Sequence, residues 1–201
     1  MPTEVLILEN KTHGIKMKFR SRQEEFYNSL SHFFLAVISL FFLFDSSDSF
    51  KVFFFFSFVT FASSFVYHAT SNHKHKLFFC KVDVASIYWL IAATVYDLLP
   101  RYAGIGFLGL AILLSIPTLV MWMNALYSDV ALIMLAVVAF MLPMIIGNFR
   151  ITSLLGLAAY AVGLPFYFLG NKLGWMHTVW HVFVCMGWSI YVIGKLNYGF
   201  V

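Results

Sequence analysis

Charged residues are scarce in this chain, and their scarcity limits its class more than any motif does. Lysine, arginine, aspartate and glutamate make up 11% of the 201 residues, whereas 61% are hydrophobic. Because soluble domains carry about 25% charged residues, this composition excludes a soluble enzyme or binding module and predicts an integral membrane protein. The formal net charge of +4 comes from basic residues near the N-terminus and in one loop. That pattern is typical of a topology signal, so we expect no nucleic-acid partner.

Cysteine is almost absent as well. Cys80 and Cys185 are the two cysteines, and both lie within or beside apolar runs, so they predict buried thiols and no disulfide framework. The chain also lacks a linker and a convincing internal repeat. Its first 25 residues are polar and have no early apolar core of the kind found in a signal peptide. We therefore expect a cytoplasmic polar tail at 1–25 and one transmembrane domain at 26–201.

Long apolar runs are what the chain has in abundance. Seven segments approach the length of about 20 residues that a helix needs to cross a bilayer. They span residues 26–44, 50–70, 82–99, 103–122, 129–147, 151–169 and 175–194. The sequence therefore predicts an all-α integral membrane protein with seven transmembrane helices. The turn between the fourth and fifth spans is the least defined, because only Pro117 and Asn124 mark it.

The distribution of lysine and arginine predicts the orientation in the membrane. Seven spans joined by short loops place the two termini on opposite sides. Nine lysines and arginines fall on the side of the N-terminus and four on the other side. Because cytoplasmic loops carry the excess of basic residues, we expect the N-terminus in the cytoplasm and the C-terminus outside.

Several polar residues lie within these spans at helical spacing. His177 and His181 stand four residues apart, which puts both imidazoles on one face of a helix. Ser64 and His68 repeat that spacing at the end of the second span, and Asp83 opens the third. Because the spans alternate in direction, all five residues fall at the predicted cytoplasmic end. Polar groups in a membrane are costly and mark functional sites, so this coincidence indicates a site.

The three histidines predict a metal centre. His68, His177 and His181 can supply three nitrogen ligands to Zn²⁺, and catalytic zinc sites commonly keep a fourth position for water. The residues between the paired histidines include no glutamate that could act as a base, unlike the motif of metalloproteases. We therefore assign the base to Asp83, and we assign Ser64 as a hydrogen-bond donor to the water or to an oxyanion.

Glu25, Asn28 and His32 open the first span, at helical spacing and on the same side. Two interpretations stay open for them. The three residues either stabilise the start of a helix through ordinary polar contacts, or they support the metal ligands and form a polar entrance to the site.

Together these motifs resemble the hemolysin III family, which is related to the progestin and adipoQ receptors and, more distantly, to the alkaline ceramidases. The resemblance covers nearly the whole chain after Arg22, and its motifs come in the family's order. They are Glu25-x-x-Asn28-x-x-x-His32, Ser64-x-x-x-His68, Asp83 with the apolar residues that follow it, and His177-Thr-Val-Trp-His181. The chain departs from the family at Val84, where members often have a histidine or a basic residue, and in the residues before Pro100.

The resemblance implies seven helices with a cytoplasmic N-terminus. It also implies zinc held by His68, His177 and His181, with Asp83 and Ser64 beside the metal. The ceramidase branch hydrolyses the amide of ceramide. The compact size suits the bacterial hemolysin III branch, which implies the bacterial cytoplasmic membrane as the location.

Three functional hypotheses follow. The first is a zinc-dependent intramembrane hydrolase that cleaves an amide or ester bond of a membrane lipid. The second is a receptor-like protein without enzymatic activity, in which zinc ties helices together. The third is a pore-forming or lytic protein of the hemolysin III type, although the fourth, fifth and sixth spans offer few polar residues to line a pore. The sequence carries no signal for an oligomeric state.

Overall fold

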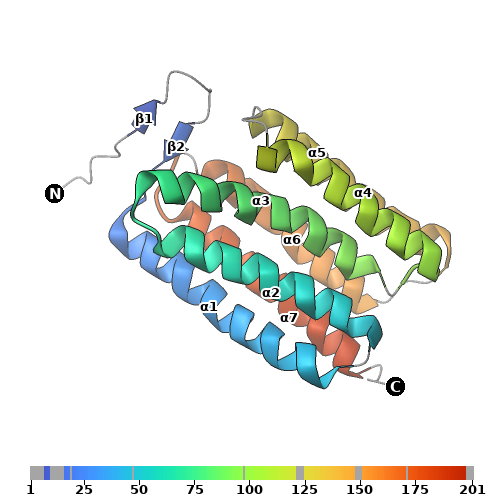
Figure 1. Ribbon diagram of the computed structural model, residues 1–201. Coiled ribbons are helices and arrows are strands. Elements are labelled where there is room, and N and C mark those ends of the chain that lie inside the picture. Colours follow the sequence, from blue (N-terminus) through green and yellow to red (C-terminus); the bar gives the residue numbers. More distant parts are fainter. Residues whose placement is uncertain are drawn as a thin grey trace.

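The computed structural model describes residues 7–9, 16–18, 20–46, 48–96, 98–120, 125–147, 151–170 and 172–197. In these ranges the chain forms seven helices that lie side by side in a bundle (Figure 1). They are α1 (Arg22–Asp45), α2 (Asp48–Ala69), α3 (His73–Val95), α4 (Arg101–Val120), α5 (Ala125–Ile145), α6 (Ile151–Leu169) and α7 (Met176–Asn197). Each contains a stretch long and apolar enough to cross a membrane, which confirms the predicted seven-helix membrane fold.

The N-terminal segment contains an element that the sequence did not predict. Strands β1 (Ile7–Glu9) and β2 (Lys16–Lys18) pair antiparallel, with Ile7 opposite Lys18. The pairing satisfies backbone groups that a loose polar tail would leave to water. The remaining residues before Arg20 lie outside the described residues.

Five helices begin earlier than predicted, and a capping residue explains the starts of α1 and α3. The Ser21 hydroxyl accepts a hydrogen bond from the Glu24 N–H at 3.2 Å, so α1 begins four residues before the predicted boundary at residue 26. The Asn72 side chain accepts hydrogen bonds from the N–H groups of Lys74 and His75, so α3 begins nine residues before residue 82. Such side chains satisfy the free N–H groups of a first helical turn. The charged residues before the third span are therefore helical and not a loop.

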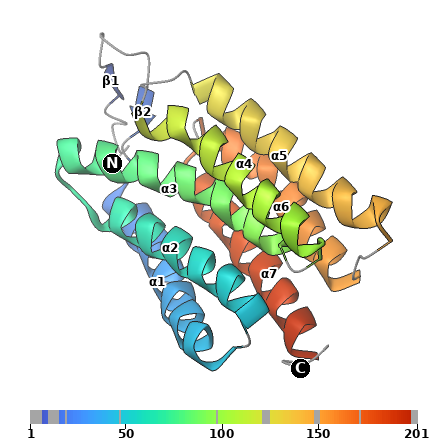
Figure 2. The same ribbon diagram turned by 45° about the vertical axis from the view of Figure 1, so that its right-hand side comes forward.

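Helix α1 packs against α2 and α7, and α2 and α7 also contact each other, since the Trp188 indole N–H donates to the Ser57 hydroxyl at 3.0 Å. Helix α2 packs against α3, helix α3 packs against α4 and α5, and α6 packs along α7 (Figure 2). Phe54 and Phe61 of α2 are fully buried at the centre of the α1–α2–α7 core. Because the helices alternate in direction, the start of α1, the end of α2 and the starts of α3 and α7 share one end of the bundle. This confirms that the polar motifs meet at one end, and the side of the membrane on which it lies stays a prediction.

Glycines bring α6 and α7 into close contact. A Cβ atom at Gly156 would lie 2.9 Å from the Gly187 carbonyl oxygen, and one at Gly187 would lie 2.8 Å from the Gly156 carbonyl oxygen. One Cβ at Gly163 would lie 2.7 Å from the Cβ of Phe183. Membrane helices associate through small residues that let their backbones approach. This seam fixes α7, which carries two of the predicted metal ligands, against α6.

We expect Gly187→Ala to lower the midpoint of thermal unfolding in detergent. The added methyl group meets a backbone oxygen that cannot move without displacing α6, and overpacking of this kind costs about 1–3 kcal/mol. The matched control is Gly109→Ala on α4, where a Cβ would meet nothing within 4 Å. There the better helix propensity of alanine predicts an unchanged or slightly higher midpoint. Equal midpoints for the two variants would contradict the proposed seam.

Candidate metal centre

Three histidines from two helices converge at the polar end of the bundle. His68 lies at the end of α2, and His177 and His181 lie in the first two turns of α7. One ring nitrogen of each lies within 4.8 Å of the corresponding nitrogens of the other two. The ring centroids are 4.6 Å apart for His177 and His181, and 4.9 Å apart for His68 and His181. The structure therefore brings together the three side chains that spacing and topology predicted.

The chemistry of these side chains fits a zinc ion. His68 and His181 are each 3% exposed, and among the described residues Nε2 of His68 and Nδ1 of His181 have no hydrogen-bond partner. Buried polar atoms nearly always have a hydrogen-bond or metal partner, so we expect these two nitrogens to bind one. Three ligand nitrogens around a tetrahedral zinc stand roughly 3.4 Å apart. The three nitrogens, which lie within 4.8 Å of one another, are therefore near the spacing that a zinc ion requires.

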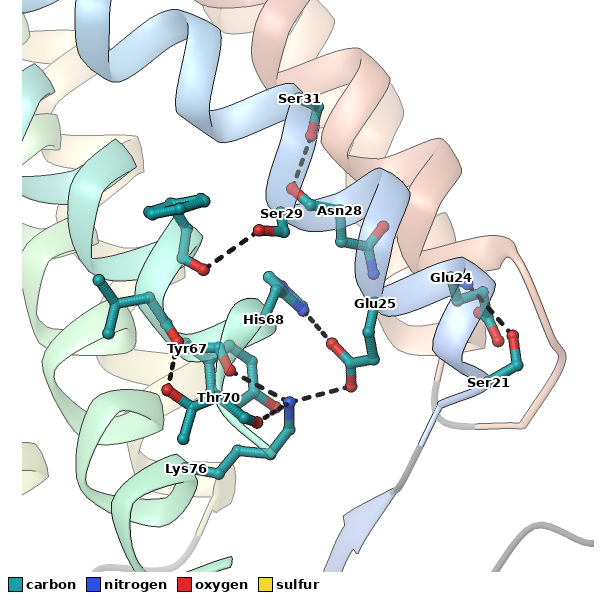
Figure 3. A network of polar contacts seen from close by, with 12 residues as sticks. Ser21, Glu24, Glu25, Asn28, Ser29, Ser31, Tyr67, His68, Thr70 and Lys76 are labelled. Carbon is teal, nitrogen blue, oxygen red and sulfur yellow. Dashed lines mark hydrogen bonds and ion pairs between the residues drawn. The ribbon is translucent and has the colours of Figure 1, made fainter. Parts of the chain in front are cut away.

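Glu25 contacts the ring nitrogen of His68 that faces away from the other histidines' ligand atoms. The distance between Nδ1 of His68 and Oε2 of Glu25 is 2.6 Å (Figure 3). A metal-binding histidine usually donates its second N–H to a carboxylate, which fixes the tautomer and the ring orientation. This contact favours the interpretation of Glu25 as support for a metal ligand over an ordinary helix start.

Lys76 completes this polar group. Its ammonium group lies 3.2 Å from Oε1 of Glu25 and donates hydrogen bonds to the carbonyl oxygens of Tyr67 and Thr70 (Figure 3). Those carbonyls belong to the last turn of α2 and its end, where the helix leaves acceptors free. Lys76 therefore caps α2 and balances the charge of Glu25. Lys76 falls in the loop predicted between the spans 50–70 and 82–99, and the structure corrects this, because the Asn72 cap starts α3 at His73 and Lys76 is a buried helical residue.

Asn28 and His32 extend the polar interior along α1. They are 0% and 5% exposed, and the His32 ring centroid lies 4.2 Å from that of His181. Within the part of the chain that the structure describes, neither ring nitrogen of His32 and neither amide atom of Asn28 has a hydrogen-bond partner. Both side chains are buried, and His32 lies beside His181, so the structure brings His32 to the histidine cluster.

Ser64 and Asp83 form a pair between α2 and α3. Ser64 is 2% exposed, one turn before His68, and its hydroxyl lies near the Asp83 carboxylate. The Asp83 backbone carbonyl accepts a hydrogen bond from Ser86, whose hydroxyl lies 3.2 Å from that of Ser63. Asp83 stands in the third turn of α3 and not at its start, because α3 begins at His73. The structure links Asp83 to the histidines through Ser64 and α2.

Two contacts at this end of the bundle were not predicted from the sequence. The backbone N–H of Trp175 donates to Oε1 of Glu24 at 2.7 Å, and the rings of Tyr27 and Trp175 lie 5.9 Å apart. The pattern of Ser21 followed by two glutamates was available as a helix start, and it would have placed both carboxylates in a first turn. Their partners, 43 and 151 residues away, depend on tertiary packing.

We expect Lys76→Met to lower the stability of the protein by about 1–3 kcal/mol, because it leaves two α2 carbonyls and the Glu25 carboxylate without their cation. Thermal unfolding of the purified protein in detergent measures the effect. Lys74→Met is the control, since Lys74 is exposed in the same first turn of α3 and exposed substitutions usually stay within about 0.5 kcal/mol. A Lys76 variant as stable as the Lys74 variant would refute the capping role.

Comparison of the chain with protein-family models, with curated proteins and with solved structures finds no match in any of the three.

Proposed function

We propose that this protein is a zinc-dependent intramembrane hydrolase that cleaves an amide or ester bond of a lipid. The observation that supports it best is the convergence of three buried histidines, from α2 and α7, whose ligand nitrogens lie within 4.8 Å of one another. Ser64 stands one helical turn before His68, and the Asp83 carboxylate lies near the Ser64 hydroxyl. The motif resemblance to the hemolysin III family agrees with this proposal and rests on the same residues.

His68, His177 and His181 would hold the ion, and Glu25 would keep the His68 ring in place. A zinc ion bound there supplies Lewis acidity, which activates water and polarises a carbonyl group. Asp83 accepts the proton of the attacking water and returns it to the leaving group. Ser64 orients the Asp83 carboxylate and can donate a hydrogen bond to the developing oxyanion. The paired histidines have no acid between them, so α3 provides the base.

A lipid substrate fits the position of the site. The histidines lie in the first or last turns of helices that cross the membrane, and the outward faces of the bundle carry large apolar side chains such as Phe41, Leu113 and Ile145. A substrate would reach the site from the bilayer. The ceramidases that the motifs distantly resemble cleave an amide. The count of basic residues favours the cytoplasmic side for the site, and the resemblance to the bacterial hemolysin III branch implies the bacterial inner membrane.

The metal assignment predicts about one zinc per chain in the purified protein, measured by elemental analysis. His181→Ala removes one of the three ligands, and we expect it to lose most of that zinc. His75→Ala is the control, because His75 is exposed at the same end of the bundle and should leave the zinc content unchanged. A zinc content well below one per chain in the unaltered protein would contradict the assignment.

The catalytic assignment predicts that Asp83→Asn keeps its zinc and loses turnover. Removal of a general base costs about 10²–10⁴-fold in rate, measured as release of fatty acid from ceramide and from a lysophospholipid ester in reconstituted vesicles. Full turnover by Asp83→Asn would show that the base is elsewhere. A zinc-loaded protein that cleaves neither lipid would favour the receptor-like alternative. Dye leakage from the vesicles that survives loss of all three histidines would favour the pore.

A further inference from the structure

The first turn of α1 carries two adjacent carboxylates that contact different helices. Glu25 contacts His68 at the end of α2, whereas Glu24, which is 6% exposed, accepts the hydrogen bond from the backbone N–H of Trp175. Successive residues of a helix point about 100° apart, so neighbouring side chains can reach two sides. Because α1 packs against both α2 and α7, its first turn can contact one residue at the end of α2 and another at the start of α7.

Trp175 stands at the start of α7 in an unusual conformation. Its φ angle is 64°, in the left-handed region that bulky residues rarely adopt. Its carbonyl oxygen accepts the N–H of Val179 at 3.0 Å, which places Trp175 at the N-cap position of α7. An indole cannot accept the hydrogen bonds that a serine or aspartate would accept there. A strained residue persists where its surroundings hold it, and here they include Glu24 and the Tyr27 ring.

The start of α7 sets the position of two of the three histidines. His177 follows Trp175 by two residues and His181 by six, so any rotation or shift of this helix start moves both rings. His68 is held by Glu25, the residue next to Glu24. The Ser21 hydroxyl, which accepts the Glu24 N–H, fixes the turn that carries both carboxylates. Glu25 and Glu24 thus connect the two halves of the histidine cluster through α1, in addition to the direct contact of α2 with α7 through Ser57 and Trp188.

We propose that Glu24 is a positioning residue for the metal centre, acting through the Trp175 backbone to set the two α7 histidines against His68. This role rests on the proposed metal site. In this role Glu24 acts by accepting a hydrogen bond, and its negative charge does not act on the metal. An acceptor of the same length without the charge should therefore preserve the geometry. A shorter side chain with the charge should not.

The test is a titration of the full-length, metal-free protein in detergent with Co²⁺, which takes the place of zinc and is read by visible absorption. We expect Glu24→Ala to weaken Co²⁺ binding by about 10–100-fold, as loss of a partner behind a metal ligand usually does. Glu24→Gln keeps the acceptor and should stay within about threefold of the unaltered protein, since a neutral hydrogen bond keeps part of the strength of a charged one. The Co²⁺ affinity of Glu24→Asp should lie between the affinities of these two variants. Glu24→Asp replaces the alanine variant in the test if the alanine variant fails to fold.

The control for a general loss of stability is Ser115→Ala on α4, which removes the hydroxyl that accepts the Trp89 indole N–H at 2.9 Å. We expect a lower thermal midpoint with unchanged Co²⁺ affinity. Weakened binding in this control to the extent seen in Glu24→Ala would overturn the positioning role, as would tight binding by Glu24→Ala and Glu24→Asp or weak binding by Glu24→Gln. If the unaltered protein binds no Co²⁺, the metal site itself is wrong and the role of Glu24 falls with it.

Discussion

The contact between Glu25, His68 and Lys76 is the constraint on which this end of the molecule depends. A charged carboxylate within a membrane bundle needs a partner of opposite charge and hydrogen bonds for its oxygens. Lys76 supplies the charge at 3.2 Å and His68 supplies a ring nitrogen at 2.6 Å. The same lysine binds the free carbonyls at the end of α2. One buried ion pair thus fixes the junction of α1, α2 and α3 and the ring plane of one histidine.

Helix α1 is the element that joins the two halves of the site. His68 belongs to α2, and His177 and His181 belong to α7, and α1 packs against both helices. Its first turn holds α2 through Glu25 and α7 through Glu24, and its third turn places His32 beside His181. The glycine seam holds α7 from the other side, against α6. A site built from side chains of separate membrane helices is accurate only if the helices are held this way on both sides.

Much of the fold and the cluster could be predicted because both follow from local rules. Apolar length gives the seven spans, short loops force alternating directions, and four-residue spacing pairs Ser64 with His68 and His177 with His181. These rules suffice to bring the three histidines to one end. They fail where a capping residue starts a helix that the composition does not predict. Asn72 does this, because it makes the charged segment after it the first turns of α3 and so buries Lys76. They also fail for the contact between Glu24 and Trp175, because the donor is a backbone N–H, which nearly every residue has and which the sequence therefore does not single out.

The separation of the proposed base from the metal ligands has a structural reason. Within His177-Thr-Val-Trp-His181, the residues between the ligands turn away from the shared face of the helix, and Gly163 of α6 packs against Trp180. An acid at the position of Trp180 would therefore meet α6. On α3, by contrast, the Asp83 carboxylate lies near the Ser64 hydroxyl, and Ser64 lies on the face of α2 that carries His68. Helix α6 also borders the cluster, because the ring centroids of its Tyr167 and of His177 are 6.3 Å apart.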